Sequence, residues 1–161
     1  MELLWKNLLF TLVVPGVVGV YLPLWLVPDR AVTSQGLLFA AGLALLGMGG
    51  GIYSWCVWDF AAFGRGTPLP LEAPKKLVSR GLYRVTRNPM YLGVLSVILG
   101  WAALFAGSAL LAYLAVVGLC FHLFVVYYEE PRLRRSFGAE YATYCSRVPR
   151  WLPRPPFVRA R

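Results

Sequence analysis

Long apolar runs separated by short polar segments dominate the pattern of this chain. The first run extends from Leu8 to Val27 and the second from Gly36 to Trp58. As a helix, each is long enough to cross a ~30 Å hydrocarbon core. Pro15 and Pro23 should bend the first helix. In the second, Gly47 and Gly51 are four residues apart, a spacing that lets another membrane helix approach closely. We prefer this interpretation to a phosphate-binding glycine loop, because the glycines lie inside an apolar run.

A third apolar run, residues 90–128, contains no formally charged residue. It is too long for one helix, and its natural break is Gly107-Ser108. We predict a hairpin of two helices, about 90–106 and 109–128, of which the first is short and need not cross the full core. The segment from Asp59 to Met90 is predicted to be a loop with a short amphipathic stretch near residues 75–83.

The tail beyond Arg132 has the three- and four-residue spacing of an amphipathic helix. Its apolar face carries Leu133, Phe137, Tyr141, Tyr144 and Val148. Its polar face carries Arg134, Arg135, Glu140 and Arg147. Such a helix suits the membrane interface or the end of a bundle.

The composition agrees with a membrane protein. Of 161 residues, 58% are hydrophobic and 14% charged, whereas a soluble domain has roughly 25% charged residues. We therefore predict an all-α integral membrane bundle of about four transmembrane helices, the third and fourth forming the hairpin, plus the C-terminal amphipathic helix. The whole chain, 1–161, is predicted to be one domain, with two transmembrane helices in residues 1–58.

The formal net charge is +9, and the basic residues gather in the 59–90 segment and in the tail. A basic chain can indicate nucleic-acid binding. Here, however, the positive charges flank apolar spans, as the positive-inside rule describes. We therefore predict a multi-pass protein with both termini and the 59–90 segment on the cytoplasmic side, in contact with membrane lipids and not nucleic acid. Three cysteines without CxxC spacing and a single histidine predict no metal site.

Two adjacent carboxylates, Glu129 and Glu130, follow the uncharged run. At the end of a membrane helix such a pair is costly to bury unless positive charge meets it. Two interpretations remain open. The carboxylates are solvated at the interface and pair with Arg132 or Arg134, or they bind a cationic ligand group such as an ammonium.

The segment Arg87-Asn-Pro-Met-Tyr-Leu-Gly93 is typical of a helix start. Proline is favoured in the first turn, and Asn88 before it is a good N-cap. Free N–H groups at a helix N-terminus can also bind acceptor atoms of a ligand, and Gly93 permits close approach. We predict that this helix start and the two carboxylates are two halves of one pocket.

Together the two segments resemble the isoprenylcysteine carboxyl methyltransferase and phospholipid methyltransferase superfamily. The similarity lies in the pattern Leu77-Val-Ser-x-Gly-x-Tyr83-x-x-x-Arg87-Asn-Pro-x-Tyr91-x-Gly93, followed by Glu129-Glu-x-x-Leu133-x-x-x-Phe-Gly138-x-x-Tyr141-x-x-Tyr144-x-x-x-Val-Pro-Arg150-x-x-Pro153.

The resemblance implies an S-adenosylmethionine-dependent methyltransferase whose cofactor-binding region is residues 75–153. Its acceptor would be lipophilic or membrane-associated: a prenylcysteine-like carboxylate, a phospholipid amine or a small hydrophobic molecule. The catalytic residues implied are Arg87, Glu129 and Glu130. The cofactor-binding residues implied are Leu77, Val78, Gly81, Tyr83, Arg87, Asn88, Pro89, Tyr91, Leu92, Gly93, Glu129 and Glu130. Asn88 stands where the family commonly has His, so we expect no acid–base role there.

On the substrate side we place His122, Tyr141 and Arg150. His122 is either a hydrogen-bonded core histidine or a pocket residue. Arg150 binds either a substrate or cofactor carboxylate or a lipid phosphate. Two other functions remain as alternatives: a membrane sterol-reductase-like enzyme that uses NADPH, and a non-catalytic membrane scaffold of the same fold. The sequence does not indicate an oligomeric state.

Overall fold

The computed structural model describes residue 13, residues 15–27, residue 32, and residues 35–64 and 77–153. Helices make up most of these residues, and no strand occurs among them, which confirms the all-α prediction. Of the predicted first span, 8–27, residue 13 and residues 15–27 are described. Within it the structure has a π-helical turn, Val17–Tyr21, followed by α2 (Leu22–Trp25).

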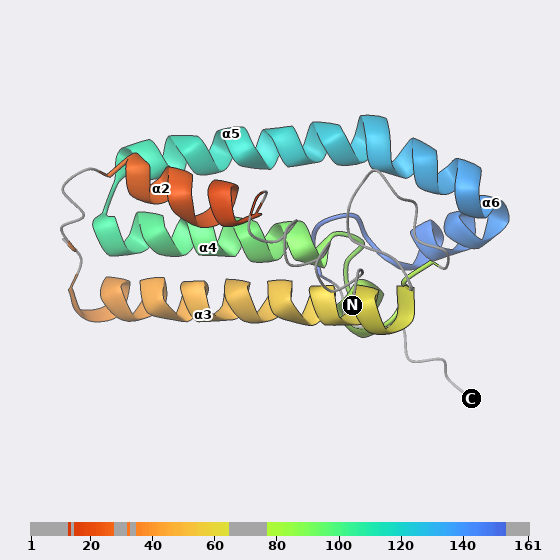
Figure 1. Ribbon diagram of the computed structural model, residues 1–161, viewed down its shortest axis with the longest axis horizontal. Helices are drawn as coiled ribbons and strands as arrows, with labels where there is room; N and C mark the ends of the chain where they lie inside the picture. The colour runs from red at the N-terminus through yellow and green to blue at the C-terminus, as the bar shows by residue number, and fades with distance from the viewer. Residues whose placement is uncertain (1–12, 14, 28–31, 33–34, 65–76, 154–161) are drawn as a thin grey trace.

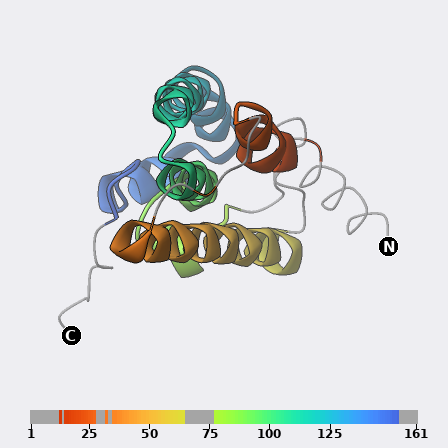
Figure 2. The same ribbon diagram turned by 90° about the vertical axis from the view of Figure 1, so that its left-hand side faces the viewer.

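Three helices run side by side along the long axis of the molecule: α3 (Gly36–Asp59), α4 (Pro89–Phe105) and α5 (Ser108–Phe124). In both views α4 lies between the other two (Figures 1 and 2). Buried Val94 and Ile98 of α4 pack against Val117 of α5 to form the central part of the core. The site described below lies beyond the N-terminal end of α4.

Glycine backbones touch where α3 meets α4. A Cβ atom added to Gly49 would lie 2.5 Å from the carbonyl oxygen of Gly93, and one added to Gly100 would lie 3.0 Å from the carbonyl oxygen of Gly42. On each helix the two glycines are seven residues apart, or about two turns, so they share one face. We call these four residues the glycine seam.

The sequence predicted the wrong glycines for this contact. Among the described residues, a Cβ atom added to Gly47 or to Gly51 would meet nothing within 4 Å, so neither residue faces α4. The prediction that the glycines of α3 serve helix packing holds for Gly42 and Gly49 instead.

The predicted hairpin is confirmed. α4 ends at Phe105, Ala106 adopts a left-handed conformation (φ 48°), and α5 begins at Ser108. The helix then continues without a break past the predicted end of the fourth span. A π-helical turn, Val125–Glu129, leads directly into α6 (Glu130–Arg147), which is kinked at Gly138.

The predicted amphipathic tail is also confirmed in α6. Tyr141 and Val148 are buried, and Leu133, Phe137 and Tyr144 are half-buried, whereas the predicted polar face, Arg134, Arg135, Glu140 and Arg147, is exposed. The predicted loop begins too early. Asp59 is a buried residue at the end of α3, and a π-helical turn, Phe60–Gly64, follows it. Residues 65–76 lie outside the described part, and Gly81–Arg84 form a short 3-10 turn.

Two helical stretches are long and apolar enough to cross a membrane, Gly36–Ala62 and Ser108–Arg147. α4, with 17 residues, is shorter. It measures about 26 Å, less than a ~30 Å hydrocarbon core. Large apolar side chains point outward from several helices: Leu37 is 87% exposed, Trp58 69% and Tyr127 76%. Apolar surface of this kind suits contact with lipid. The predicted count of four spans is not established by the described residues.

Candidate functional site

The start of α4 is built as the sequence predicts, but Asn88 has a different role. Pro89 occupies the first turn and Asn88 the N-cap position, yet the Asn88 side chain makes no capping hydrogen bond. Its amide nitrogen Nδ2 instead donates to the carbonyl oxygen of Arg150, 3.0 Å away. The buried Asn88 side chain therefore holds a distant part of the chain against this helix end, and the prediction of a side-chain cap is wrong.

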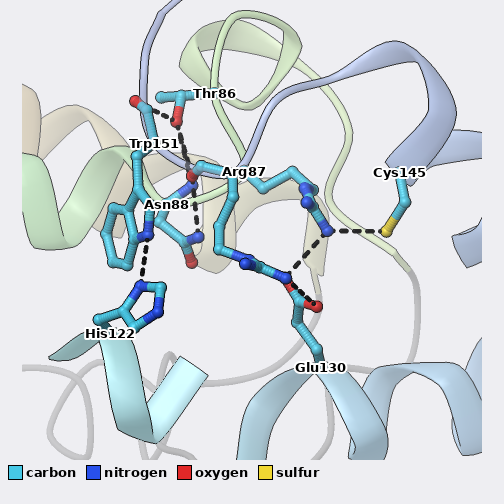
Figure 3. A network of polar contacts seen from close by, with 8 residues as sticks. Thr86, Arg87, Asn88, His122, Glu130, Cys145 and Trp151 are labelled. Atoms are coloured by element: carbon cyan, nitrogen blue, oxygen red, sulfur yellow. Dashed lines mark hydrogen bonds and ion pairs between the residues drawn. The ribbon is translucent and has the colours of Figure 1, made fainter. Parts of the chain in front are cut away.

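That distant part is residues 148–151, which we call the strap (Figure 3). The backbone N–H of Arg87 donates to the carbonyl oxygen of Pro149 at 2.9 Å. The hydroxyl of buried Thr86 lies 3.1 Å from the carbonyl oxygen of Arg150 and 3.0 Å from that of Trp151. With the Asn88 bond, these contacts fix the strap across the N-terminus of α4.

Glu130 joins the strap to α4 by charge. Its carboxylate accepts hydrogen bonds from Arg87 Nη1 at 3.0 Å, from Arg150 Nε at 2.6 Å and from Arg150 Nη2 at 2.9 Å. Glu130 is only 6% exposed. A buried carboxylate needs such partners, because it has lost its hydration. The hydrogen bond to Glu130 raises the pKa of Arg150.

These contacts correct one interpretation. Glu130 is buried and not solvated at the interface, and it accepts hydrogen bonds from Arg87 and Arg150, which lie far from it in sequence. The Arg150 guanidinium is bound to Glu130, and the expected contact of Arg150 with a ligand carboxylate or a lipid phosphate stays a prediction.

The guanidinium of Arg87 makes one more contact and, among the residues that are described, has a hydrogen-bond donor to spare. Its Nη1 also lies 2.9 Å from the sulfur of Cys145. Its Nε is buried and has no hydrogen-bond partner within the part of the chain that is described. Buried donors without an acceptor are rare in proteins, so this one calls for an explanation.

Glu129 points to a different set of neighbours. The hydroxyl of Tyr91 donates to Glu129 Oε1 at 2.6 Å. The ring of Tyr91 lies 4.6 Å from that of Phe121 and 6.5 Å from that of Trp151, measured between ring centroids. The adjacent carboxylates are therefore divided, one in an arginine pair and the other beside aromatic rings. The predicted proximity of the helix start to the twin carboxylates is confirmed by the Arg87–Glu130 and Tyr91–Glu129 hydrogen bonds, whereas a pocket shared by the two segments stays a prediction.

Other predicted cofactor residues lie against α3. Val78 and Tyr83 pack with Cys56 in a small core. Burial raises the pKa of Tyr83, and its carbonyl oxygen accepts a hydrogen bond from the Tyr144 hydroxyl at 2.7 Å. Gly81 adopts a left-handed conformation (φ 54°) beside the carboxylate of Asp59. Leu77 and Leu92 are half-buried, and Pro89 is buried.

Gly93 is one of the four residues of the glycine seam. We expected Gly93 to permit the close approach of a ligand. In the structure it is helix α3 that approaches, because a Cβ atom at this position would meet the backbone of Gly49. A cofactor role for Gly93 remains a prediction, and packing is sufficient to explain the glycine.

Of the predicted substrate residues, Tyr141 is 2% exposed and packs beside Tyr144. His122 is hydrogen-bonded but exposed, so it is not the core histidine that was one of its two interpretations. Sequence reasoning missed Thr86 and Trp151. Thr86 directly precedes the Arg87-Asn-Pro motif, so its position was a usable signal.

Comparison with known proteins assigns the chain to a family. A model of the phospholipid methyltransferase family matches residues 37–140, which include nearly all of α3, all of α4 and α5, and both glutamates. The chain belongs to this family. This confirms the superfamily that its motifs resemble. The family match ends within α6, so the strap lies beyond it.

One curated relative matches a shorter stretch. The chain is 34% identical over 82 residues to Protein-S-isoprenylcysteine O-methyltransferase B of Arabidopsis thaliana, which is 51% of this chain and 42% of that protein. This member of the phospholipid methyltransferase family therefore covers less than half the length of that relative. No solved structure matches the chain.

Proposed function

We propose that the chain is a membrane-embedded methyltransferase that transfers a methyl group from S-adenosylmethionine to a lipophilic acceptor. Membership of the phospholipid methyltransferase family supports methyl transfer as the reaction. The observation that carries the proposal is the meeting of the α4 start with the twin carboxylates, through the Arg87–Glu130 and Tyr91–Glu129 contacts. The acceptor is a prenylcysteine-like carboxylate, a phospholipid amine or a small hydrophobic molecule.

The residues present fit the cofactor in three respects. The buried Nε of Arg87 lacks an acceptor, which a ligand oxygen or nitrogen can supply. Glu129 lies outside the arginine pair, so its carboxylate suits the α-ammonium of the methionine part. The rings of Tyr91 and Phe121 beside Glu129 suit a sulfonium, because the faces of aromatic rings attract cations.

This fit divides the work of the two glutamates. Glu129 binds the cofactor's ammonium, and Tyr91 orients it. Both oxygens of Glu130 accept hydrogen bonds from arginines, so Glu130 is a positioning residue that holds Arg87 and the strap in place. Glu130 therefore does not contact the ammonium directly.

S-adenosylmethionine, when bound, supplies a methyl group already activated by its sulfonium. The chain must then align the acceptor with that methyl group and exclude water, which are the contributions of orientation and desolvation. A carboxylate acceptor is reactive as it stands. An amine acceptor must first lose a proton, and Glu129 is the carboxylate placed to receive it.

We place the site on the cytoplasmic side of a multi-pass membrane protein. The two apolar helical stretches support insertion into the bilayer, and the basic residues flanking them support this orientation. A lipophilic acceptor then reaches the site from the bilayer, while the cofactor reaches it from the water.

Ligand binding to the purified protein in detergent micelles tests the cofactor. S-adenosylhomocysteine should bind, measured by isothermal titration calorimetry, and NADPH should not. Glu129→Gln should weaken binding by about tenfold to 150-fold, because a hydrogen bond to a charged group contributes about 1.5–3 kcal/mol. The exposed carboxylate of Glu140 on α6 gives the matched control, Glu140→Gln, which should bind as the wild type does. Binding of NADPH alone would point to a reductase instead.

A second experiment tests the reaction. The protein is incubated with S-adenosylmethionine carrying a labelled methyl group and with a total lipid and small-molecule extract. The label should enter an extractable lipophilic product with the wild type and not with Arg87→Ala. Binding of S-adenosylhomocysteine without any labelled product would favour the non-catalytic scaffold.

A further inference from the structure

Trp151 makes contacts that hold its indole in one place. The indole Nε1–H donates to Nδ1 of His122 on α5, 3.1 Å away (Figure 3). The Trp151 and His122 ring centroids are 6.1 Å apart, and the Tyr91 ring lies 6.5 Å from Trp151. The side chain therefore connects the strap to both α4 and α5.

The backbone beneath this indole is fixed independently. The carbonyl oxygen of Trp151 lies 3.0 Å from the Thr86 hydroxyl, and the preceding residue is held by Asn88 and Glu130. These contacts do not involve the indole. A change confined to the indole therefore leaves the strap in place, which allows the role of the side chain to be tested separately.

The contact with α5 lies on an apolar outer face. His122 is exposed, and its neighbours one turn before it and one residue after it, Leu119 and Leu123, are 57% and 43% exposed. Leu119 lies three residues before His122 and four before Leu123, so it is a surface neighbour of both. Trp151 thus lies between the Tyr91–Glu129 pair and a helix face suited to lipid.

We propose that Trp151 is an acceptor-binding residue, and that the apolar chain of the lipophilic substrate packs against its indole along α5. His122 is the positioning residue that sets the indole's orientation. This inference rests on the proposed function, and it adds where the acceptor lies relative to Glu129. The ligand class is an amphiphile whose reactive head reaches the Tyr91–Glu129 end while its hydrocarbon chain extends toward Leu119 and Leu123.

The test measures methyl transfer and cofactor binding on the same preparations. The acceptor probes are N-acetyl-S-farnesyl-cysteine and dioleoyl phosphatidylethanolamine in mixed micelles, and the one that the wild type methylates is used for the variants. Trp151→Phe should raise the acceptor KM by up to about fivefold, because the hydrogen bond that holds the ring in its binding orientation contributes about 1 kcal/mol. Trp151→Ala should raise it roughly tenfold or more, because apolar contact is also lost. In both variants kcat and the Kd for S-adenosylhomocysteine should stay unchanged. A raised KM with an unchanged kcat indicates a lost contact that binds the acceptor equally well in the ground state and in the transition state.

His122→Phe should raise the KM as Trp151→Phe does, and the double variant should be no worse than either single one, because both remove the same hydrogen bond. The matched control is Trp101→Phe. Trp101 Nε1 donates to the carbonyl oxygen of Gly19 at 3.1 Å, so the same chemical change is made away from the strap. This control should leave the acceptor KM unchanged.

An unchanged acceptor KM in Trp151→Ala would overturn the inference and leave the proposed function intact. A parallel loss of S-adenosylhomocysteine binding would also overturn it, because Trp151 would then support the fold of the whole site. A wild type that binds S-adenosylhomocysteine but methylates neither amphiphile would refute the acceptor class assigned here. A wild type that neither binds S-adenosylhomocysteine nor transfers a methyl group would refute the proposed function itself.

Discussion

Gly49→Ala offers a direct test of the glycine seam. The added methyl group would lie 2.5 Å from the carbonyl oxygen of Gly93, 2.8 Å from Val97 Cγ2 and 2.9 Å from the Val97 backbone nitrogen. Two of these three atoms belong to the backbone of α4 and cannot turn away as a side chain can. For the oxygen contact to reach an ordinary 3.4 Å, the two helices must separate locally by close to 0.9 Å.

The size of the effect follows from two opposing terms. Overpacking of a well-packed core costs about 1–3 kcal/mol, and the upper part of that range applies where backbone atoms are in the way. Replacing a helical glycine with alanine stabilises the helix by about 0.5–1 kcal/mol. Gly49→Ala should therefore lower the free energy of unfolding by about 2 kcal/mol.

Gly47→Ala on the same helix is the matched control, because its methyl group would meet nothing within 4 Å. Only the helix-propensity term applies, so this variant should be more stable by about 0.5–1 kcal/mol. Both can be measured in detergent micelles by titration with sodium dodecyl sulfate, with circular dichroism reporting helix content. Equal changes in the two variants, or a stabilised Gly49→Ala, would refute the seam.

Three further predictions concern the site, and thermal unfolding in detergent measures each. Glu130→Gln should destabilise the protein by about 2–4 kcal/mol, because it leaves buried positive charge unpaired. Glu129→Gln should destabilise it less. The reverse order would contradict the assignment of the structural role to Glu130 and not to Glu129. Asn88→Asp should destabilise the protein by about 1–3 kcal/mol although Asp is an equally good N-cap, because the donor to the strap is lost and a buried acceptor then faces the carbonyl oxygen of Arg150. An unchanged midpoint would indicate that the residue acts as a cap. Gly81→Ala should lower the free energy of unfolding by about 1–2 kcal/mol for its left-handed backbone alone, and the clash with Asp59 should lower it further. A variant as stable as the wild type would show that this turn has a different conformation.

The hairpin and the amphipathic tail were predictable because they depend on local pattern. The uncharged run with a break at Gly107-Ser108 and the apolar stripe through Tyr141 need no knowledge of distant contacts. The convergence of the α4 start with Glu129 and Glu130 was also predicted, from two polar groups that adjoin the same apolar hairpin and from the family resemblance.

The partners within the site were not predictable in this way. Glu130 was matched with arginines close to it in sequence, but its partners are Arg87, 43 positions before it, and Arg150, 20 positions after it. Asn88 was read as a local cap, whereas its hydrogen bond reaches the strap. Both errors arise because local preference was the only information available, and tertiary contacts override it.

The glycine seam could have been predicted from the spacing of glycines in the sequence. Gly42 and Gly49 are seven residues apart, and so are Gly93 and Gly100. Equal spacing on two helices allows both glycine pairs to meet at once. The four-residue spacing of Gly47 and Gly51 has no such counterpart in the seam.

The position of the strap has a consequence for the order in which the protein is made. Translation produces α3, α4 and α5 well before residues 148–151, so the ribosome can deliver these helices to the membrane while Thr86, Arg87 and Asn88 still lack their later partners. The contacts at the N-terminal end of α4 consequently form after the three helices themselves. Nascent chains that stall before Arg150 would contain the helical hairpin without a finished site.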